Sequence, residues 1–135
     1  MRTTTEFPAG ELIDLSSQVA GLERRSRRFV GVPQPGGPPQ RIDGYTVGAP
    51  KLTGDAPHDG EMHPDGDELL FLVSGRVQVT LELDDGVRDL EVGPGEALVV
   101  PRGVWHKVHL LEPGQLVHIT PGPHFEHRPR PDRRP

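Results

Sequence analysis

The amino-acid sequence predicts an all-β protein, a single-domain antiparallel β-barrel or jelly roll. The first observation behind this prediction is the abundance of turn-forming residues: the 135 residues include 17 glycines and 16 prolines, which interrupt long helices. The second is a series of short apolar runs at close, even spacing with turn residues between them. This pattern is typical of all-β folds rather than of alternating strands and helices. A chain of this length supplies one modest hydrophobic core.

The N-terminal segment, residues 1–41, is polar and interrupted, so we expect an arm ahead of the main domain. Residues 12–15 and 29–32 are short apolar runs that suit edge strands. Residues 22–29 have the length of one or two helical turns. A Pro/Gly-rich linker over residues 33–39 then leads into the domain.

The β-domain is expected over residues 42–121. Its predicted strands are residues 45–47, 69–73, 77–83, 89–92, 97–101, 104–111 and 116–120. Residues 84–86, Asp-Asp-Gly, have the composition of a tight hairpin turn, and residues 93–96 form a second turn. The last segment, residues 122–135, carries too much proline and arginine for a strand, so we expect a mobile C-terminal tail there.

Charge and composition argue against several classes of function. A net charge of -5 and an aromatic content of 4% give no basic, aromatic surface for nucleic acid. The chain has no cysteine, so a disulfide framework, a thiolate metal site and a cysteine nucleophile are excluded. No apolar run approaches the ~20 residues that span a bilayer, and the N-terminus lacks the pattern of a secretion signal. We therefore expect a cytoplasmic protein without a membrane partner.

Two carboxylates and two histidines form a candidate site for one metal ion. Side chains two apart on a strand point to the same face, so Glu61 and His63 can enter one cavity together. By the same rule Glu68 lies on the inward face of its strand together with two leucines. His106 lies on the inward face of a later strand, and His109 on the outward face of that strand. Imidazole and carboxylate ligands suit a divalent Fe, Mn, Ni or Zn ion.

The spacing of these residues resembles that of the cupin superfamily. The first cupin motif ends in a histidine, a glutamate and a glycine, which His63, Glu68 and Gly75 match in spacing. The second motif is matched by Gly95, Pro101, Gly103 and His106. The 19 residues between the two motifs suit the hairpin that joins them in that family. The resemblance covers roughly residues 42–121 and implies a cupin-like barrel.

The chain departs from the cupin pattern at three positions. Glu61 stands where a cupin has its first metal-binding histidine, Asp55 where the first motif opens with glycine, and Leu110 where the second closes with asparagine. Three roles stay open for Glu61: a fourth metal ligand, a general acid or base beside a three-residue site, or a solvent-facing residue at the barrel mouth.

The other histidines suit structural roles. His118 alternates with two apolar residues on a late strand, as is typical of a hydrogen-bonded core or edge histidine. Four more, His58, His109, His124 and His127, suit loop, outer-face and tail positions. We expect none of these four to belong to the site.

Cupins include dioxygenases, isomerases, cyclases, lyases and proteins without catalytic activity, so the resemblance does not by itself define a reaction. We predict a metal-dependent enzyme that acts on a small organic molecule by oxygenation or by Lewis-acid chemistry of the isomerase, cyclase or lyase type. The alternative is a cupin that binds a small ligand, or a metal for stability, without turnover. Edge strands of a small barrel tend to pair with a neighbour, so we expect a homodimer.

Overall fold

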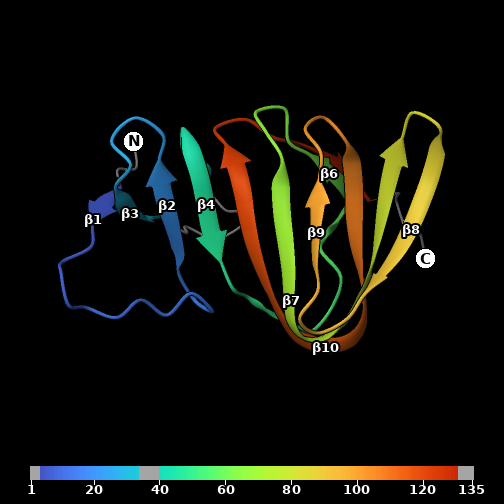
Figure 1. The fold of residues 1–135 in the computed structure, drawn as a ribbon, viewed down its shortest axis with the longest axis horizontal. Helices are drawn as coiled ribbons and strands as arrows, with labels where there is room; N and C mark the ends of the chain where they lie inside the picture. Colours follow the sequence, from blue (N-terminus) through green and yellow to red (C-terminus); the bar gives the residue numbers. More distant parts are fainter. Residues whose placement is uncertain (1–3, 34–39, 131–135) are drawn as a thin grey trace.

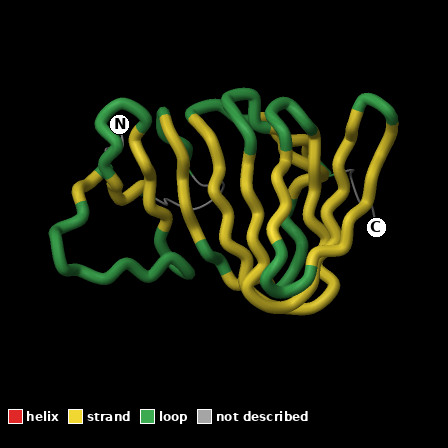
Figure 2. The backbone as a smooth tube through the Cα atoms, viewed as in Figure 1, coloured by secondary structure: helices red, strands yellow, loops and turns green. Residues whose placement is uncertain are grey.

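The fold consists of strands and loops (Figure 1). The computed structural model describes residues 4–33 and 40–130. The strands are β1 (Thr5–Glu6), β2 (Val19–Glu23), β3 (Phe29–Val32), β4 (Gly44–Gly48), β5 (Lys51–Leu52), β6 (His58–Met62), β7 (Glu68–Leu83), β8 (Gly86–Val92), β9 (Ala97–Val100), β10 (Trp105–Gly122) and β11 (Glu126–Pro129). Across the described residues no helix is long and apolar enough to cross a membrane (Figure 2).

The strands pair antiparallel throughout, which confirms the predicted all-β antiparallel fold. The strand order is β1-β3-β2-β4-β10-β6-β11, while β7 pairs with β10, β8 and β9, and β5 pairs with β10. β10 is the central element, because its first half pairs with β6 and the second half of β7, and its second half pairs with β4 and the first half of β7. The sheet therefore curves along β10, which turns round at the lower end of Figure 1.

The long pair of β7 and β10 bends at Gly75. This glycine has a φ of +83°, and a Cβ added there would lie 2.6 Å from the carbonyl oxygens of Glu112 and Pro113. The register between the two strands shifts over residues 110–116, on the opposite side of the same bend. A residue without a side chain is needed where the two backbones approach so closely.

The hydrophobic core follows the period-two alternation of β7. Residues 68, 70 and 72 are buried before the bend, and residues 77, 79 and 81 after it. The core cluster consists of Leu70, Leu72, Val77, Val79, Leu81, Val92, Val100 and Leu116. Glu68 thus begins its strand on the same face as the core leucines, in the phase that the sequence indicates.

In the N-terminal segment one predicted strand is confirmed and two predictions are wrong. Residues 29–32 form β3, but residues 12–15 form no strand and Leu12 is fully exposed. Residues 22–29 form no helical turns; they hold the end of β2, a turn and the start of β3, a hairpin in which Leu22 pairs with Phe29. Sheet pairing with β4 overrides the local helical pattern.

The strands of the predicted β-domain are present, with two mergers. The runs 69–73 and 77–83 belong to one strand, β7, and the runs 104–111 and 116–120 belong to β10. The hairpin turn after β7 has the predicted position, since Leu83 pairs with Gly86. Short-range patterns miss such mergers because a bend interrupts the alternation without ending the pairing.

The prediction of no strand after residue 122 is also wrong, because residues 126–129 form β11 and pair with β6. Arg128 holds this strand: its guanidinium lies 4.0 Å from the centre of the Trp105 ring and 2.6 Å from Glu82. Pro129 is tolerated because β11 is an edge strand. Of the predicted linker and tail, residues 34–39 and 131–135 lie outside the described residues.

Candidate metal site

Three buried side chains from three parts of the chain converge at one point. His63 follows β6 directly, Glu68 begins β7, and His106 is the second residue of β10. Their ligand atoms all lie within 4.8 Å of one another. His106 Nε2 lies 2.9 Å from one Glu68 carboxylate oxygen, and His63 Nε2 lies 3.5 Å from the other.

The backbone fixes the loops that carry these residues. His106 pairs with Glu61 across β10 and β6, which places the start of β10 beside the end of β6. In addition, the amide of Gly103 donates a hydrogen bond of 3.0 Å to the carbonyl oxygen of His63. Gly103 has a φ of +77°, a conformation that favours glycine. The second motif is therefore tied by its glycine to the histidine of the first.

The imidazole of His63 fits a metal ligand. Both of its ring nitrogens are buried and make no hydrogen bond. A buried polar atom without a partner is costly, and a metal ion is one partner that relieves that cost. Burial lowers the pKa of His63 although Glu68 and Glu61 oppose this effect. The ring is thus neutral near neutral pH, the state in which imidazole binds a metal.

Glu68 and His106 form a tightly coupled pair. Burial by itself raises the pKa of Glu68, but the hydrogen bond and charge of His106, with His63 and the Thr120 hydroxyl, lower it to about 2. Burial likewise acts to lower the pKa of His106, and the hydrogen bond and charge of Glu68 outweigh it and raise the pKa. His106 Nδ1 donates to the carbonyl oxygen of Val104 at 3.4 Å, which directs Nε2 toward Glu68.

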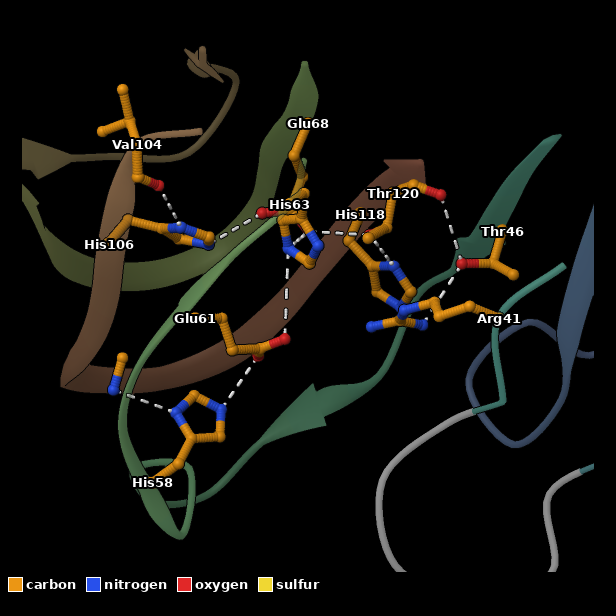
Figure 3. A network of polar contacts seen from close by, with 11 residues as sticks. Arg41, Thr46, His58, Glu61, His63, Glu68, Val104, His106, His118 and Thr120 are labelled. Carbon is orange, nitrogen blue, oxygen red and sulfur yellow. Dashed lines mark hydrogen bonds and ion pairs between the residues drawn. The ribbon is translucent and has the colours of Figure 1, made fainter. Parts of the chain in front are cut away.

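Glu61 lies beside this cluster rather than within it (Figure 3). Its nearer carboxylate oxygen is 4.0 Å from His63 Nε2, and the other is 2.8 Å from His58 Nε2. His58 Nδ1 accepts the amide hydrogen of Gly60 at 3.2 Å, so Nε2 carries the ring proton and donates it to Glu61. The carboxylate is a quarter exposed and faces the cavity.

A cavity of about 530 Å³ opens beside the site, with Glu68 and His106 in its wall. Its volume is in the range of small-molecule sites. Much of its wall is apolar, formed by Pro50, Leu52, Leu70, Val108, Leu110 and Leu116. Its polar side chains are Arg41, His58, Glu61, Glu68, His106, Lys107, His118, Thr120 and His127.

Six of these polar residues were not assigned to the site from the sequence: Arg41, His58, Lys107, His118, Thr120 and His127. The expectation that His58 and His127 lie away from the site is wrong, because both line the cavity. Thr120 donates a buried hydrogen bond of 2.7 Å to Glu68, and His118 Nδ1 lies 3.0 Å from the Thr120 hydroxyl. Strand phase could have revealed both, since residues 116, 118 and 120 are two apart and share the inward face of β10. His58 reaches the site through Glu61. Arg41 precedes β4 in a loop, where no sequence pattern indicates its direction.

The protein-family model described as the cupin domain matches residues 53–120, about half of the chain. This range includes all of the candidate ligands. The chain belongs to the cupin family. This membership confirms the resemblance and the cupin-like fold that the two motifs indicate. None of the curated proteins matches the chain.

Several solved structures resemble this cupin. A cupin-2 domain protein from Shewanella frigidimarina is 26% identical, with a TM-score of 0.49, over 61% of this chain and 74% of that one. A protein from Neisseria meningitidis is 30% identical, with a TM-score of 0.47, over 61% and 79%. Oxalate decarboxylase from Bacillus subtilis, which has Mn(II) centres, is 19% identical, with a TM-score of 0.50, over 63% and 23%. At that identity the last likeness shows the fold alone.

Proposed function

We propose that this cupin is a metal-dependent enzyme that acts on a small organic molecule, and that His63, Glu68 and His106 bind one divalent ion. The observation that supports the proposal is the convergence of three buried ligand atoms within 4.8 Å beside a cavity of about 530 Å³. A bound Fe, Mn, Ni or Zn ion would supply either dioxygen activation or Lewis-acid polarisation of a substrate oxygen.

The protein orients its ligands through hydrogen bonds behind them. The Thr120 hydroxyl donates to Glu68, and the Val104 carbonyl accepts from His106 Nδ1. Both contacts leave the other side of each ligand free to face the ion. Such supporting contacts fix ligand geometry and raise metal affinity in metalloproteins.

Two alternative roles are open to Glu61 within this proposal. Its distance of 4.0 Å from His63 Nε2 allows it to act as a fourth ligand after a small movement. Held by His58, it is also placed to accept or return a proton on a substrate in the cavity. Metal analysis of Glu61→Gln separates the two roles. If Glu61 is a fourth ligand, the affinity for the metal should fall in this variant; if Glu61 is an acid or base, that affinity should be retained.

The alternative is a cupin that binds a ligand or a structural metal without turnover. A catalytic ion keeps an open coordination position, and a structural one does not. Co(II)-loaded protein titrated with azide tests this difference through its visible absorption. We expect the spectrum to change as azide binds, with no change in Co(II) content. A spectrum that azide leaves unchanged would favour the alternative.

The proposal extends to a homodimer. Four apolar residues pair in one row across four neighbouring strands: Val47 of β4, Ile119 of β10, Leu69 of β7 and Val99 of β9. Their side chains therefore lie on one face of the sheet. Phe71 and Val117 add a second row on the same face. Val99 is half exposed and the others of these rows are partly exposed, which is typical of a surface that a second subunit covers.

A further inference from the structure

We infer that Arg41 makes the cavity of this cupin a binding site for a small monocarboxylate with an apolar body. The inference deepens the proposed function and rests on the metal site proposed above. It assigns the carboxylate to the guanidinium of Arg41 and the apolar body to the aliphatic wall of the cavity.

Arg41 carries a largely buried charge without an acidic partner. Its Nη1 donates a hydrogen bond of 3.2 Å to the Thr46 hydroxyl, and its Nε is buried with no hydrogen bond. No carboxylate among residues 4–33 and 40–130 forms an ion pair with it. Burial lowers its pKa, opposed by the more distant Glu61 and Glu68. A buried guanidinium of this kind is stabilised by an incoming anion.

The other cation in the cavity wall is already neutralised. Lys107 Nζ lies 3.2 Å from a carboxylate oxygen of Asp59. His118 is neutral near neutral pH because burial lowers its pKa. An anion that enters the cavity therefore finds its uncompensated positive charge at Arg41.

A short chain of hydrogen bonds links Arg41 to the proposed metal ligand Glu68 (Figure 3). The Thr46 hydroxyl that accepts from Arg41 donates to the carbonyl oxygen of Thr120 at 3.5 Å. The hydroxyl of Thr120 donates in turn to Glu68 at 2.7 Å. A carboxylate bound at Arg41 would thus place the neighbouring carbon atoms of the ligand beside the metal site.

The charges of the site favour a monoanion. Glu61 and Glu68 balance a divalent ion, and the histidine ligands are neutral when they bind it. Arg41 then leaves one net positive charge in the cavity. A carboxylate neutralises this charge, whereas a phosphate monoester brings up to two negative charges. The aliphatic wall includes Leu52, Val108 and Leu110, which exclude water and suit hydrocarbon.

Calorimetric titration of the metal-loaded protein tests the inference. The probes are butyrate, hexanoate, octanoate and phenylacetate, each compared with its neutral amide, and hexyl phosphate. We expect at least one acid to bind about tenfold or more tightly than its amide, since a hydrogen bond to a charged group contributes about that factor. Arg41→Met should abolish the preference for the acid and leave the affinity of the amide unchanged.

A matched control is Arg102→Met, because Arg102 is exposed and absent from the cavity wall. This variant should keep the full preference for the acid. Arg41→Gln, which keeps a donor toward Thr46, provides the same test if Arg41→Met does not fold. The inference is overturned if no acid binds more tightly than its amide, or if the Arg41 variants keep the preference for the acid over the amide. It is also overturned if hexyl phosphate binds more tightly than hexanoate.

Metal content of the same samples separates this inference from the proposed function. Wild type and both Arg41 variants should hold equal amounts of metal, because Arg41 is not a ligand. Protein without metal would contradict the proposed function, while the comparison of acid with amide would still test Arg41.

Discussion

At the scale of single residues, the groups around Glu68, with His106 foremost and Thr120 among them, keep a carboxylate charged in the protein interior. Glu68 is 5% exposed, and its pKa is nevertheless about 2. Burial alone would raise that pKa, so the groups around the carboxylate decide its charge. Thr120, itself fully buried, supplies one of them with a hydrogen bond of 2.7 Å.

Replacing Thr120 with Val keeps the shape of the side chain and removes this donor. We expect Thr120→Val to lower the free energy of unfolding of the metal-free protein by about 1–3 kcal/mol, because a buried charged acceptor loses a partner. Urea unfolding measures the change. Thr80→Val is the control, since its hydroxyl bonds to Asp89 at 2.6 Å on the exposed surface. Equal losses in the two variants would contradict the role given to Thr120.

The coupling of His106 to Glu68 predicts the order in which the site histidines titrate. In the metal-free protein His106 should titrate above its ordinary pKa of 6.5 and His63 below it. The stabilisation from the raised pKa of His106 is fully present below pH 6.5 and is lost as the pH rises through its folded pKa. Metal affinity should therefore rise with pH above 6.5, as His106 releases its proton.

Proton NMR of the ring resonances between pH 5 and 9 checks this prediction. In Glu68→Gln the pKa of His106 should fall from its wild-type value, because burial then acts without the carboxylate that opposes it most. A His106 pKa that is the same in wild type and Glu68→Gln would show that the carboxylate does not control the pair.

The candidate site was partly predictable from the sequence at this scale. Motif spacing and strand phase selected His63, Glu68 and His106, which the structure brings within 4.8 Å of one another. Glu61 was grouped with them on strand phase and on its position in the first motif. Its carboxylate points toward His58, whose ring is oriented by a hydrogen bond from the amide of Gly60, a contact that alternation does not describe.

At the scale of elements, the bend shared by β7 and β10 shapes the cavity. Leu70 of β7 and Val108 of β10 line it from opposite sides of the bend. The bend depends on Gly75, where the two backbones approach closely. The glycine matched a motif position, but the length of the merged strands could not be predicted, because a bulge leaves no regular pattern.

Gly75→Ala should destabilise the protein more than the same change at Gly95. Both glycines have a φ of +83°, but only at Gly75 would a Cβ meet backbone oxygens, at 2.6 Å. The strained φ alone costs about 1–3 kcal/mol in each variant, and the backbone clash adds to it at Gly75. Urea unfolding of the two variants measures the difference. Equal destabilisation would show that the close approach of the strands does not determine stability.

At the scale of the whole molecule, composition and turn spacing predicted the all-β fold correctly, and the errors lie toward its ends. β11 formed where proline and arginine argued against a strand, because Arg128 finds both Trp105 and Glu82 on distant strands. β2 and β3 extend the sheet beyond β4, although their residues were predicted as part of an arm. Long-range pairing of this kind cannot be derived from local patterns.

The apolar rows on the outer face of the sheet predict the oligomeric state. We expect sedimentation at micromolar concentration to give twice the chain mass of 14.8 kDa. Val99→Lys should shift the protein toward the monomer, because a charge would enter the proposed interface. Val87→Lys is the control, since Val87 is 69% exposed on β8, outside these rows. A wild type of 14.8 kDa would refute the dimer.

The measurement that tests the central claim most directly is elemental mass spectrometry of protein purified without a histidine tag. Wild type should contain nearly one equivalent of Fe, Mn, Ni or Zn, and His106→Ala should contain almost none. His109→Ala should keep its metal, because His109 lies on the same strand but faces outward and contacts Asp55. Wild type without metal after reconstitution, or metal retained in His106→Ala, would contradict the proposed metal site.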